Sequence, residues 1–192
     1  MKTAITDRKT AIGSWHYFRR LFFVSTFASS SGLTMMFNNK KDTKNMKNYD
    51  PNRQLTRNFQ LGEFIESETA CRLGIDNIPE SWEVVVHLRQ LCREVLQPLR
   101  DHVGHAIHIN SGYRCEALNE AVHGVGNSQH LYGCAADIHI PDLDTGRKWY
   151  YWMVNHLDFD QLILEHNRRG GRWLHVSFRP DYHDNRHQSW FW

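Results

Sequence analysis

The sequence has few of the residues that build zinc ribbons, redox centres or membrane spans. Its four cysteines (Cys71, Cys92, Cys115 and Cys134) are far apart and include no CxxC pair, which argues against a structural zinc ribbon and a thioredoxin-like centre. Their spacing leaves open whether they form one or two disulfides, as an exported protein would allow. No apolar run approaches the ~20 residues that a membrane-spanning helix needs, so we expect no transmembrane span.

Several catalytic signatures are also missing. The chain has no Gly-rich phosphate loop, no nucleophile elbow and no His-Glu-x-x-His segment. Its formal net charge is +2, but residues 1–50 hold nine Lys/Arg against three Asp, a surplus of +6 that leaves −4 for residues 51–192. The basic surplus lies in the segment with the least structural signal, so we predict no nucleic-acid partner.

The first 50 residues do not have the pattern of a folded unit. An apolar stretch at residues 21–28 follows two arginines and precedes small residues, as in a secretory signal. The alternative is a start placed too early, with true initiation near Met35 or Met36. Residues 38–52 are rich in Lys and Asn, which is typical of a linker.

We therefore expect three parts: a basic segment and linker at 1–50, a folded domain at 51–180, and a loosely packed C-terminal tail at 181–192. Within the domain, apolar residues recur at helical spacing over residues 81–100, and a weaker helix is predicted at 145–156. Gly104 suits the position past the end of the first helix.

Short alternating segments follow the first helix and predict strands, which are residues 106–110, 135–140, 159–165 and 173–178. The Arg168–Gly171 stretch suits a hairpin turn between the last two. A helix followed by a run of strands predicts the α+β class, as a small antiparallel sheet with helices packed on one side.

Histidine is abundant, with 13 residues, and it is the commonest metal ligand in proteins. A glycine-flanked loop carries His130, and Asp137 follows seven residues later on a predicted strand. His175 lies on the polar face of another predicted strand. Two histidines and one carboxylate suit a catalytic Zn²⁺ with its fourth position left to water. Among so many histidines this spacing can also arise by chance.

Six segments raise the hypothesis above chance because of their resemblance to a known family. They occur in order as Ser111-Gly-Tyr-Arg114, Leu118-Asn119, Ser128-Gln-His130, Gly133-x-Ala-Ala-Asp137, Phe159-Asp-Gln-Leu-Ile163 and Trp173-Leu-His-Val-Ser177. Over roughly residues 55–178 the chain resembles the M15 zinc peptidases, of the D-alanyl-D-alanine carboxypeptidase type, in the subgroup close to phage and bacterial cell-wall hydrolases.

The resemblance implies a fold shared with the hedgehog signalling domain and one Zn²⁺ per chain, held by His130, Asp137 and His175. It also implies that Arg114 contacts a carboxylate or carbonyl of the substrate. Many relatives have an acidic residue three positions before the last histidine ligand, where this chain has Arg172. Glu165, at the end of the preceding predicted strand, matches the glutamate of the hedgehog-type pattern, and we assign it as the general base.

Three further residues, Ser128, Tyr113 and His139, are candidates to orient the ligands or contact substrate. The predicted function is zinc-dependent hydrolysis of an amide bond in a peptidoglycan stem peptide by a monomer, at or near D-alanine. The alternative is a catalytically weak zinc-containing module that binds peptidoglycan or another protein. We expect a cell-envelope or secreted location, with a phage-derived cytoplasmic enzyme as the alternative. The sequence leaves open whether cleavage is terminal or internal.

Overall fold

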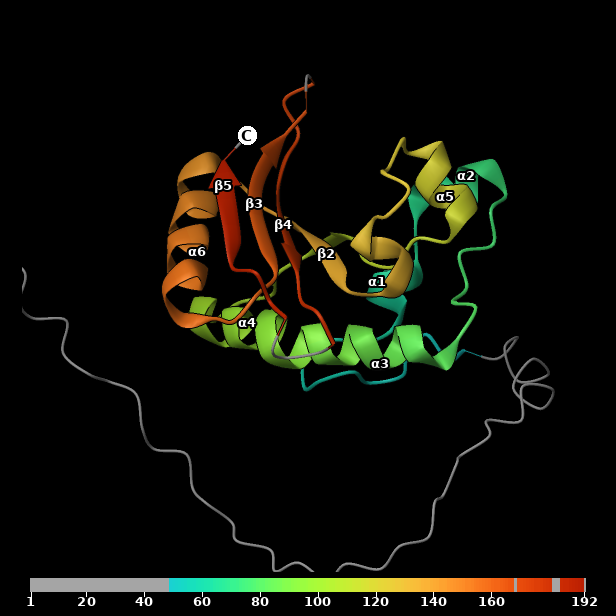
Figure 1. Ribbon diagram of the computed structural model, residues 1–192, viewed down its shortest axis with the longest axis horizontal. Coiled ribbons are helices and arrows are strands. Elements are labelled where there is room, and N and C mark those ends of the chain that lie inside the picture. The colour runs from blue at the N-terminus through green and yellow to red at the C-terminus, as the bar shows by residue number, and fades with distance from the viewer. Residues whose placement is uncertain (1–48, 168, 181–183, 192) are drawn as a thin grey trace, which may run out of the picture. The chain divides into compact units, whose positions relative to one another are not determined.

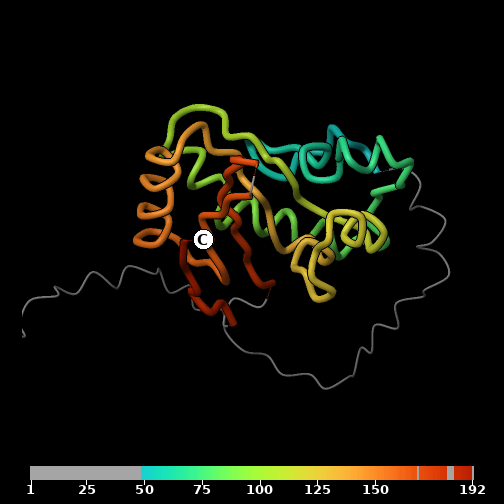
Figure 2. The backbone as a smooth tube through the Cα atoms, turned by 90° about the horizontal axis from the view of Figure 1, so that it is seen from above, coloured from blue at the N-terminus to red at the C-terminus, as the bar shows by residue number. Residues whose placement is uncertain are grey.

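The computed structural model describes residues 49–167, 169–180 and 184–191. The predictions for the N-terminal segment and linker therefore fall almost wholly outside the described residues. Among those described, no helix is long and apolar enough to cross a membrane. Figure 2 shows helix α6 (Leu143–His156) at one end of the domain and helix α5 (Glu116–Ala121) at the other.

The predicted long helix is present as one helical rod of three segments, α3 (Trp82–Leu91), η2 (Cys92–Leu96) and α4 (Gln97–Val103). In η2 the chain winds as a π-helix, and the Gln97 N–H donates to the carbonyl of Cys92, five residues back. Pro98 follows at once and has no N–H to donate, which favours a wider turn at this point. The rod ends on Gly104, whose φ of +75° suits glycine, as the sequence predicts.

A five-stranded sheet forms the centre of the domain, in the order β1-β2-β4-β3-β5. Its strands are β1 (Ile109–Ser111), β2 (Ala135–His139), β3 (Gln161–His166), β4 (Arg172–Ser177) and β5 (Gln188–Phe191). The first four pair antiparallel, and β5 pairs parallel with β3. The predicted hairpin between β3 and β4 is confirmed. Strand β1 starts three residues later than predicted and pairs with β2 through an irregular register.

The two faces of the sheet differ in character because side chains alternate along each strand. One face is apolar and buried, with Ala136, Ile138, Leu162, Leu164, Leu174 and Val176. These residues share one core with the apolar stripe of the α3–α4 rod and with Trp149, Tyr150 and Met153 of α6. Figure 1 shows α6 beside the β5 edge and the rod beneath the strands. The predicted α+β arrangement is confirmed.

The C-terminal segment differs from the predicted loose tail. Residues 188–191 form β5, and the Phe191 ring lies 4.4 Å, centroid to centroid, from that of Tyr150 on α6. Four residues give too short a pattern to reveal a strand whose partner lies 27 residues earlier. Residues 188–191 therefore belong to the sheet of the folded domain.

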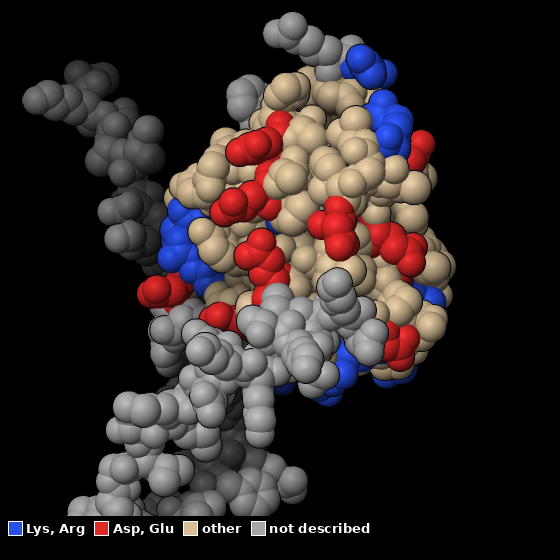
Figure 3. Space-filling model, turned by 90° about the vertical axis from the view of Figure 1, so that its right-hand side faces the viewer, with Lys and Arg blue, Asp and Glu red and all other residues tan. Residues whose placement is uncertain are grey.

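Four short helices have no counterpart in the sequence predictions. They are α1 (Gly62–Ile65), α2 (Glu68–Leu73), α5 and the 3₁₀ turn η3 (Gln129–Tyr132). Each has fewer than two full turns, so no periodic stripe develops. Helices α2 and α5 and the start of α3 contribute to the face in Figure 3, where acidic side chains outnumber basic ones. This surface agrees with the negative charge of residues 51–192.

Candidate metal centre

His130 lies in the single turn of η3 and is buried. Its Nδ1 lies 2.6 Å from the carbonyl oxygen of Gly112, so Nδ1–H donates to that oxygen and Nε2 is left without a proton. Gly112 packs so closely on Phe64 that a Cβ at this position would lie 2.7 Å from the Phe64 backbone. Glycine therefore lets the chain approach closely enough for its carbonyl to fix the tautomer of His130.

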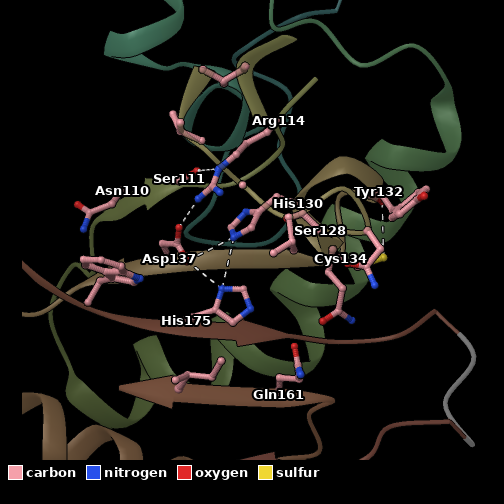
Figure 4. Close-up of a pocket in the computed structure, with 18 of the residues that line it drawn as sticks. Asn110, Ser111, Arg114, Ser128, His130, Tyr132, Cys134, Asp137, Gln161 and His175 are labelled. Carbon is pink, nitrogen blue, oxygen red and sulfur yellow. Dashed lines mark hydrogen bonds and ion pairs between the residues drawn. The ribbon is translucent and has the colours of Figure 1, made fainter. Parts of the chain in front are cut away.

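Asp137 and His175 lie on neighbouring strands and are direct partners in the β2–β4 register. Both side chains project from the face opposite the core, where Figure 4 shows them beside His130. Asp137 Oδ1 lies 2.9 Å from His175 Nδ1 and 3.3 Å from His130 Nε2, and the two ring nitrogens are 3.3 Å apart. The structure thus brings the three predicted ligands together.

The three atoms fit a zinc ion. Zn–N and Zn–O bonds of about 2.0–2.2 Å in a tetrahedron place neighbouring ligand atoms about 3.3–3.5 Å apart, close to the observed separations. Among the described residues, His130, Asp137 and His175 are the one group of three metal-ligating side chains that converge. All three residues line the same cleft.

The protonation states also suit metal binding. Burial lowers the pKa of His130 below its ordinary value, against the pull of Asp137, so the imidazole is neutral near pH 7. Burial alone would raise the pKa of Asp137, but His130 and His175 outweigh it through charge and hydrogen bonds and hold that pKa well below its usual range. The carboxylate is therefore ionised and the imidazole is free to bind a cation.

Arg114 lies against the candidate ligand Asp137 and lines the cleft. Its terminal NH2 lies 2.5 Å from Asp137 Oδ2, and its Nε donates to Ser111 Oγ at 2.8 Å. Oδ2 is thereby occupied, and Oδ1 is the oxygen that faces the two imidazoles. The family resemblance assigns Arg114 to the substrate and does not reveal this ion pair or the bond to Ser111, although Ser111 stands in the same SGYR segment. The guanidinium thus fixes the orientation of the Asp137 carboxylate.

Glu165 lines the same cleft as the ligand cluster. It pairs with Trp173 across the β3–β4 ladder, so His175 is its diagonal neighbour on the same face, about 7–8 Å away between backbones and within reach of a long side chain. Burial raises the pKa of Glu165, while the charge of His175 and a hydrogen bond from Trp173 lower it in part. The carboxyl group is thus partly desolvated in the cleft that His130, Asp137 and His175 also line.

The cleft around the cluster has a volume of about 1080 Å³. The sheet face forms its floor, with Asp137, His175, Ile163 and Glu165. The α5 helix and the loop after it form one wall, and Arg179 and Arg186 lie at another border. The cluster of His130, Asp137 and His175 therefore lies within this cleft.

The other predicted residues lie in different surroundings. Ser128 is buried and lines the cleft. Tyr113 lies in the core beyond the cleft lining, and burial raises its pKa to about 12. His139 is exposed, its ring 6.2 Å from that of His108, and it borders a separate cavity that Arg172 also lines. Tyr113 and His139 are therefore not brought to the ligand cluster.

A search of curated proteins found no match to this chain. The model of the Peptidase M15 family matches residues 57–177, well over half of the chain. The matched range contains the three candidate ligands, Arg114 and Glu165, and it ends at the last residue of β4. On this match, and with a mixed α/β fold built on a five-stranded sheet, the chain belongs to the peptidase M15 family.

Proposed function

We propose that the protein is a zinc-dependent peptidase that hydrolyses an amide bond in a peptidoglycan stem peptide, at or near D-alanine. The convergence of His130 Nε2, Asp137 Oδ1 and His175 Nδ1 on one point of the cleft floor carries the proposal. Family membership supports a peptidase that depends on zinc. The peptidoglycan substrate rests on the resemblance of the six sequence segments to cell-wall hydrolases.

Zinc held by these residues would act as a Lewis acid, lowering the pKa of a bound water to about 7 and polarising the carbonyl to be attacked. Glu165 is the side chain we assign to take the proton from the attacking water and pass it to the leaving amine. Its raised pKa suits this exchange, because a general base works best when its pKa lies nearer the working pH.

Arg114 has two proposed roles in the reaction. Its ion pair with Asp137 fixes the carboxylate that binds the metal. A guanidinium has five N–H donors, and the contacts with Asp137 and Ser111 use two of them. The others support the oxygen of the substrate carbonyl as negative charge develops on it.

The alternative, a binding module without an effective base, rests on Arg172 in the position where many relatives have an acid. Arg172 is exposed and borders two cavities other than the cleft. The acidic side chain that does line the cleft beside the ligands is Glu165. This placement favours the enzyme over the binding module.

The test is mass spectrometry of peptidoglycan fragments digested with the purified protein. We expect products shortened at an amide bond near D-alanine, no products after chelation, and full recovery on adding zinc. Glu165→Gln should lower kcat by about 100- to 10,000-fold while zinc remains bound. The matched control is Glu120→Gln on the exposed surface of α5.

The same experiment separates the two candidate functions. Zinc-loaded wild-type protein that binds the fragments without cutting them would support the binding module. Full activity in the Glu165→Gln variant would remove Glu165 as the base, although the metal centre would stand.

A further inference from the structure

Asp160 is a fully buried carboxylate outside the ligand cluster, immediately before the start of β3. It accepts hydrogen bonds from Arg186 through the backbone N–H (3.2 Å), Nε (2.9 Å) and NH2 (2.6 Å). Arg179 Nε lies 2.9 Å from its Oδ1, and Gln129 Nε2 donates to its Oδ2 at 3.0 Å. Five N–H groups thus converge on one carboxylate.

The donors come from segments that border the metal centre. Gln129 is the residue immediately before the ligand His130. Arg179 follows the end of β4, four residues after the ligand His175, and Arg186 stands two residues before β5. Asp160 therefore connects the η3 turn, which carries His130, with the chain that follows β4, the strand that carries His175.

The turn that carries His130 needs contacts with the rest of the fold to hold it in place. It is a single 3₁₀ turn of four residues, and one turn of helix is not stable in isolation. Besides local bonds, from Leu131 to Ser128 (3.1 Å) and from Cys134 to Gln129 (3.0 Å), the turn has two long-range bonds at His130: the Arg114 N–H donates to the His130 carbonyl (3.1 Å), and His130 Nδ1–H donates to the Gly112 carbonyl (2.6 Å). Both long-range bonds come from the Gly112–Arg114 segment, so a side-chain tether from Gln129 to a fixed group in a different segment holds the turn at a second point.

Asp160 is suited to be that fixed group. A buried carboxylate is costly unless charge and hydrogen bonds compensate it, and two arginines together with Gln129 do so here. Burial by itself would raise the pKa of Asp160, but the bonds from Arg186 and Gln129 outweigh it and lower the pKa. The bidentate contact with Arg186 also fixes the orientation of the carboxylate.

We propose that Asp160 is a positioning residue which, through the Gln129 amide, holds the η3 turn so that His130 Nε2 points to the metal position. Arg179 and Arg186 keep the carboxylate in place. The segment that contains Arg179 and Arg186 lies beyond the family match at 57–177, so the metal centre depends on chain outside the matched region. This inference rests on the proposed zinc site but not on the identity of the substrate.

The test measures zinc affinity in the full-length protein by competition with a chromophoric chelator. Gln129→Met keeps the length of the side chain and removes the amide, and Gln188→Met is the control. Gln188 is exposed on β5, and its side-chain oxygen accepts a hydrogen bond from the Gln161 amide at 3.1 Å. We expect Gln129→Met to weaken zinc binding about 10-fold, as removal of a partner of a ligand does, and Gln188→Met to match wild type.

Two further readouts distinguish positioning from general stability. The melting temperature of the metal-free protein should be nearly the same for Gln129→Met and Gln188→Met. The visible absorption of the cobalt-substituted protein, which reports ligand geometry, should change only in Gln129→Met. Asp160→Asn should weaken zinc binding further, and adding Gln129→Met to it should cost less than in wild type, because the tether is already broken.

Gln129→Met with the zinc affinity and cobalt spectrum of wild type would overturn the inference, even if Asp160→Asn failed to fold. Wild-type protein that holds zinc but cuts no peptide would overturn the proposed function alone, since the affinity comparison needs no substrate. Wild-type protein that binds no zinc would overturn the metal centre and this inference with it.

Discussion

Asp137 and His175 face each other across adjacent strands, with Oδ1 of the aspartate 2.9 Å from Nδ1 of the histidine. The pair is fixed by the sheet itself, since backbone bonds between β2 and β4 set which side chains are opposite. His130 completes the cluster from a separate turn. The candidate metal centre thus combines two residues of the sheet with one residue of a short turn.

Replacing a ligand on the sheet should remove the metal. We expect His175→Ala to weaken zinc binding by more than about 100-fold, beyond the loss caused by removing a partner of a ligand. The control is His139→Ala. His139 lies on the same face of β2 as Asp137, but it is exposed and lies outside the cluster. Inductively coupled plasma mass spectrometry of dialysed protein measures the zinc content. Stoichiometric zinc in His175→Ala would remove this residue from the ligand set.

Arginine and lysine should not be equivalent at position 114. A lysine can contact Asp137 but cannot also donate to Ser111 in the fixed geometry of a guanidinium. We expect Arg114→Lys to weaken zinc binding about 10-fold and to lower kcat/KM on peptide as well. Ser111→Ala keeps the ion pair and should lose less of both. Equal losses in the two variants would mean that the hydrogen bond to Ser111, rather than the ion pair, orients the guanidinium.

The sequence predicts which side chains lie on the buried face of the sheet, because apolar and polar residues alternate along the strands. Leu162, Leu164, Leu174 and Val176 alternate with cleft residues, and β3 and β4 form as predicted. The pairing of Asp137 with His175 was not accessible in this way. These residues are 38 positions apart, and β3 lies between β2 and β4 in the chain but not in the sheet. The family resemblance of the flanking segments, rather than periodicity, predicts that Asp137 and His175 belong to one site.

Contacts between distant side chains account for most of what the sequence did not reveal. Asp160 bonds Gln129 and Arg186, which are 31 and 26 residues away, and nothing in the local pattern marks it as buried. The ion pair between Arg114 and Asp137 spans 23 residues. Such networks depend on the final fold, whereas caps and alternating strands depend on neighbours in the chain.

The acid limb of the rate profile should report Glu165. A base must be deprotonated, so kcat/KM should fall as the pH falls through the pKa of this carboxyl group. Because burial raises that pKa above the ordinary value of 4.5, the fall should begin at a higher pH than an exposed glutamate would give. Initial rates across pH in zinc-saturated enzyme measure it. The small residual activity of Glu165→Gln should lack this limb, and an unchanged limb would assign it to another group.

The wall of the cleft after α5 should be sensitive to a single methyl group. Asn119 is buried, and its Nδ2 donates to the carbonyl of Val125 at 2.9 Å. The backbone carbonyl of Asn119 accepts a hydrogen bond from the Gly124 N–H at 2.8 Å. A Cβ at Gly124 would lie 2.1 Å from Asn119 Oδ1, whereas a Cβ at Gly126 would meet nothing within 4 Å.

We therefore expect Gly124→Ala to lower the free energy of unfolding by about 1–3 kcal/mol, the usual cost of overpacking, and Gly126→Ala to change it little. Neither glycine has a positive φ, so backbone strain does not separate the two variants. Urea denaturation followed by circular dichroism gives both values. Because Val125 lines the cleft, Gly124→Ala should also raise KM for peptide substrates more than Gly126→Ala does. Equal stabilities would mean that Asn119 can move aside, and that it does not fix the position of this wall.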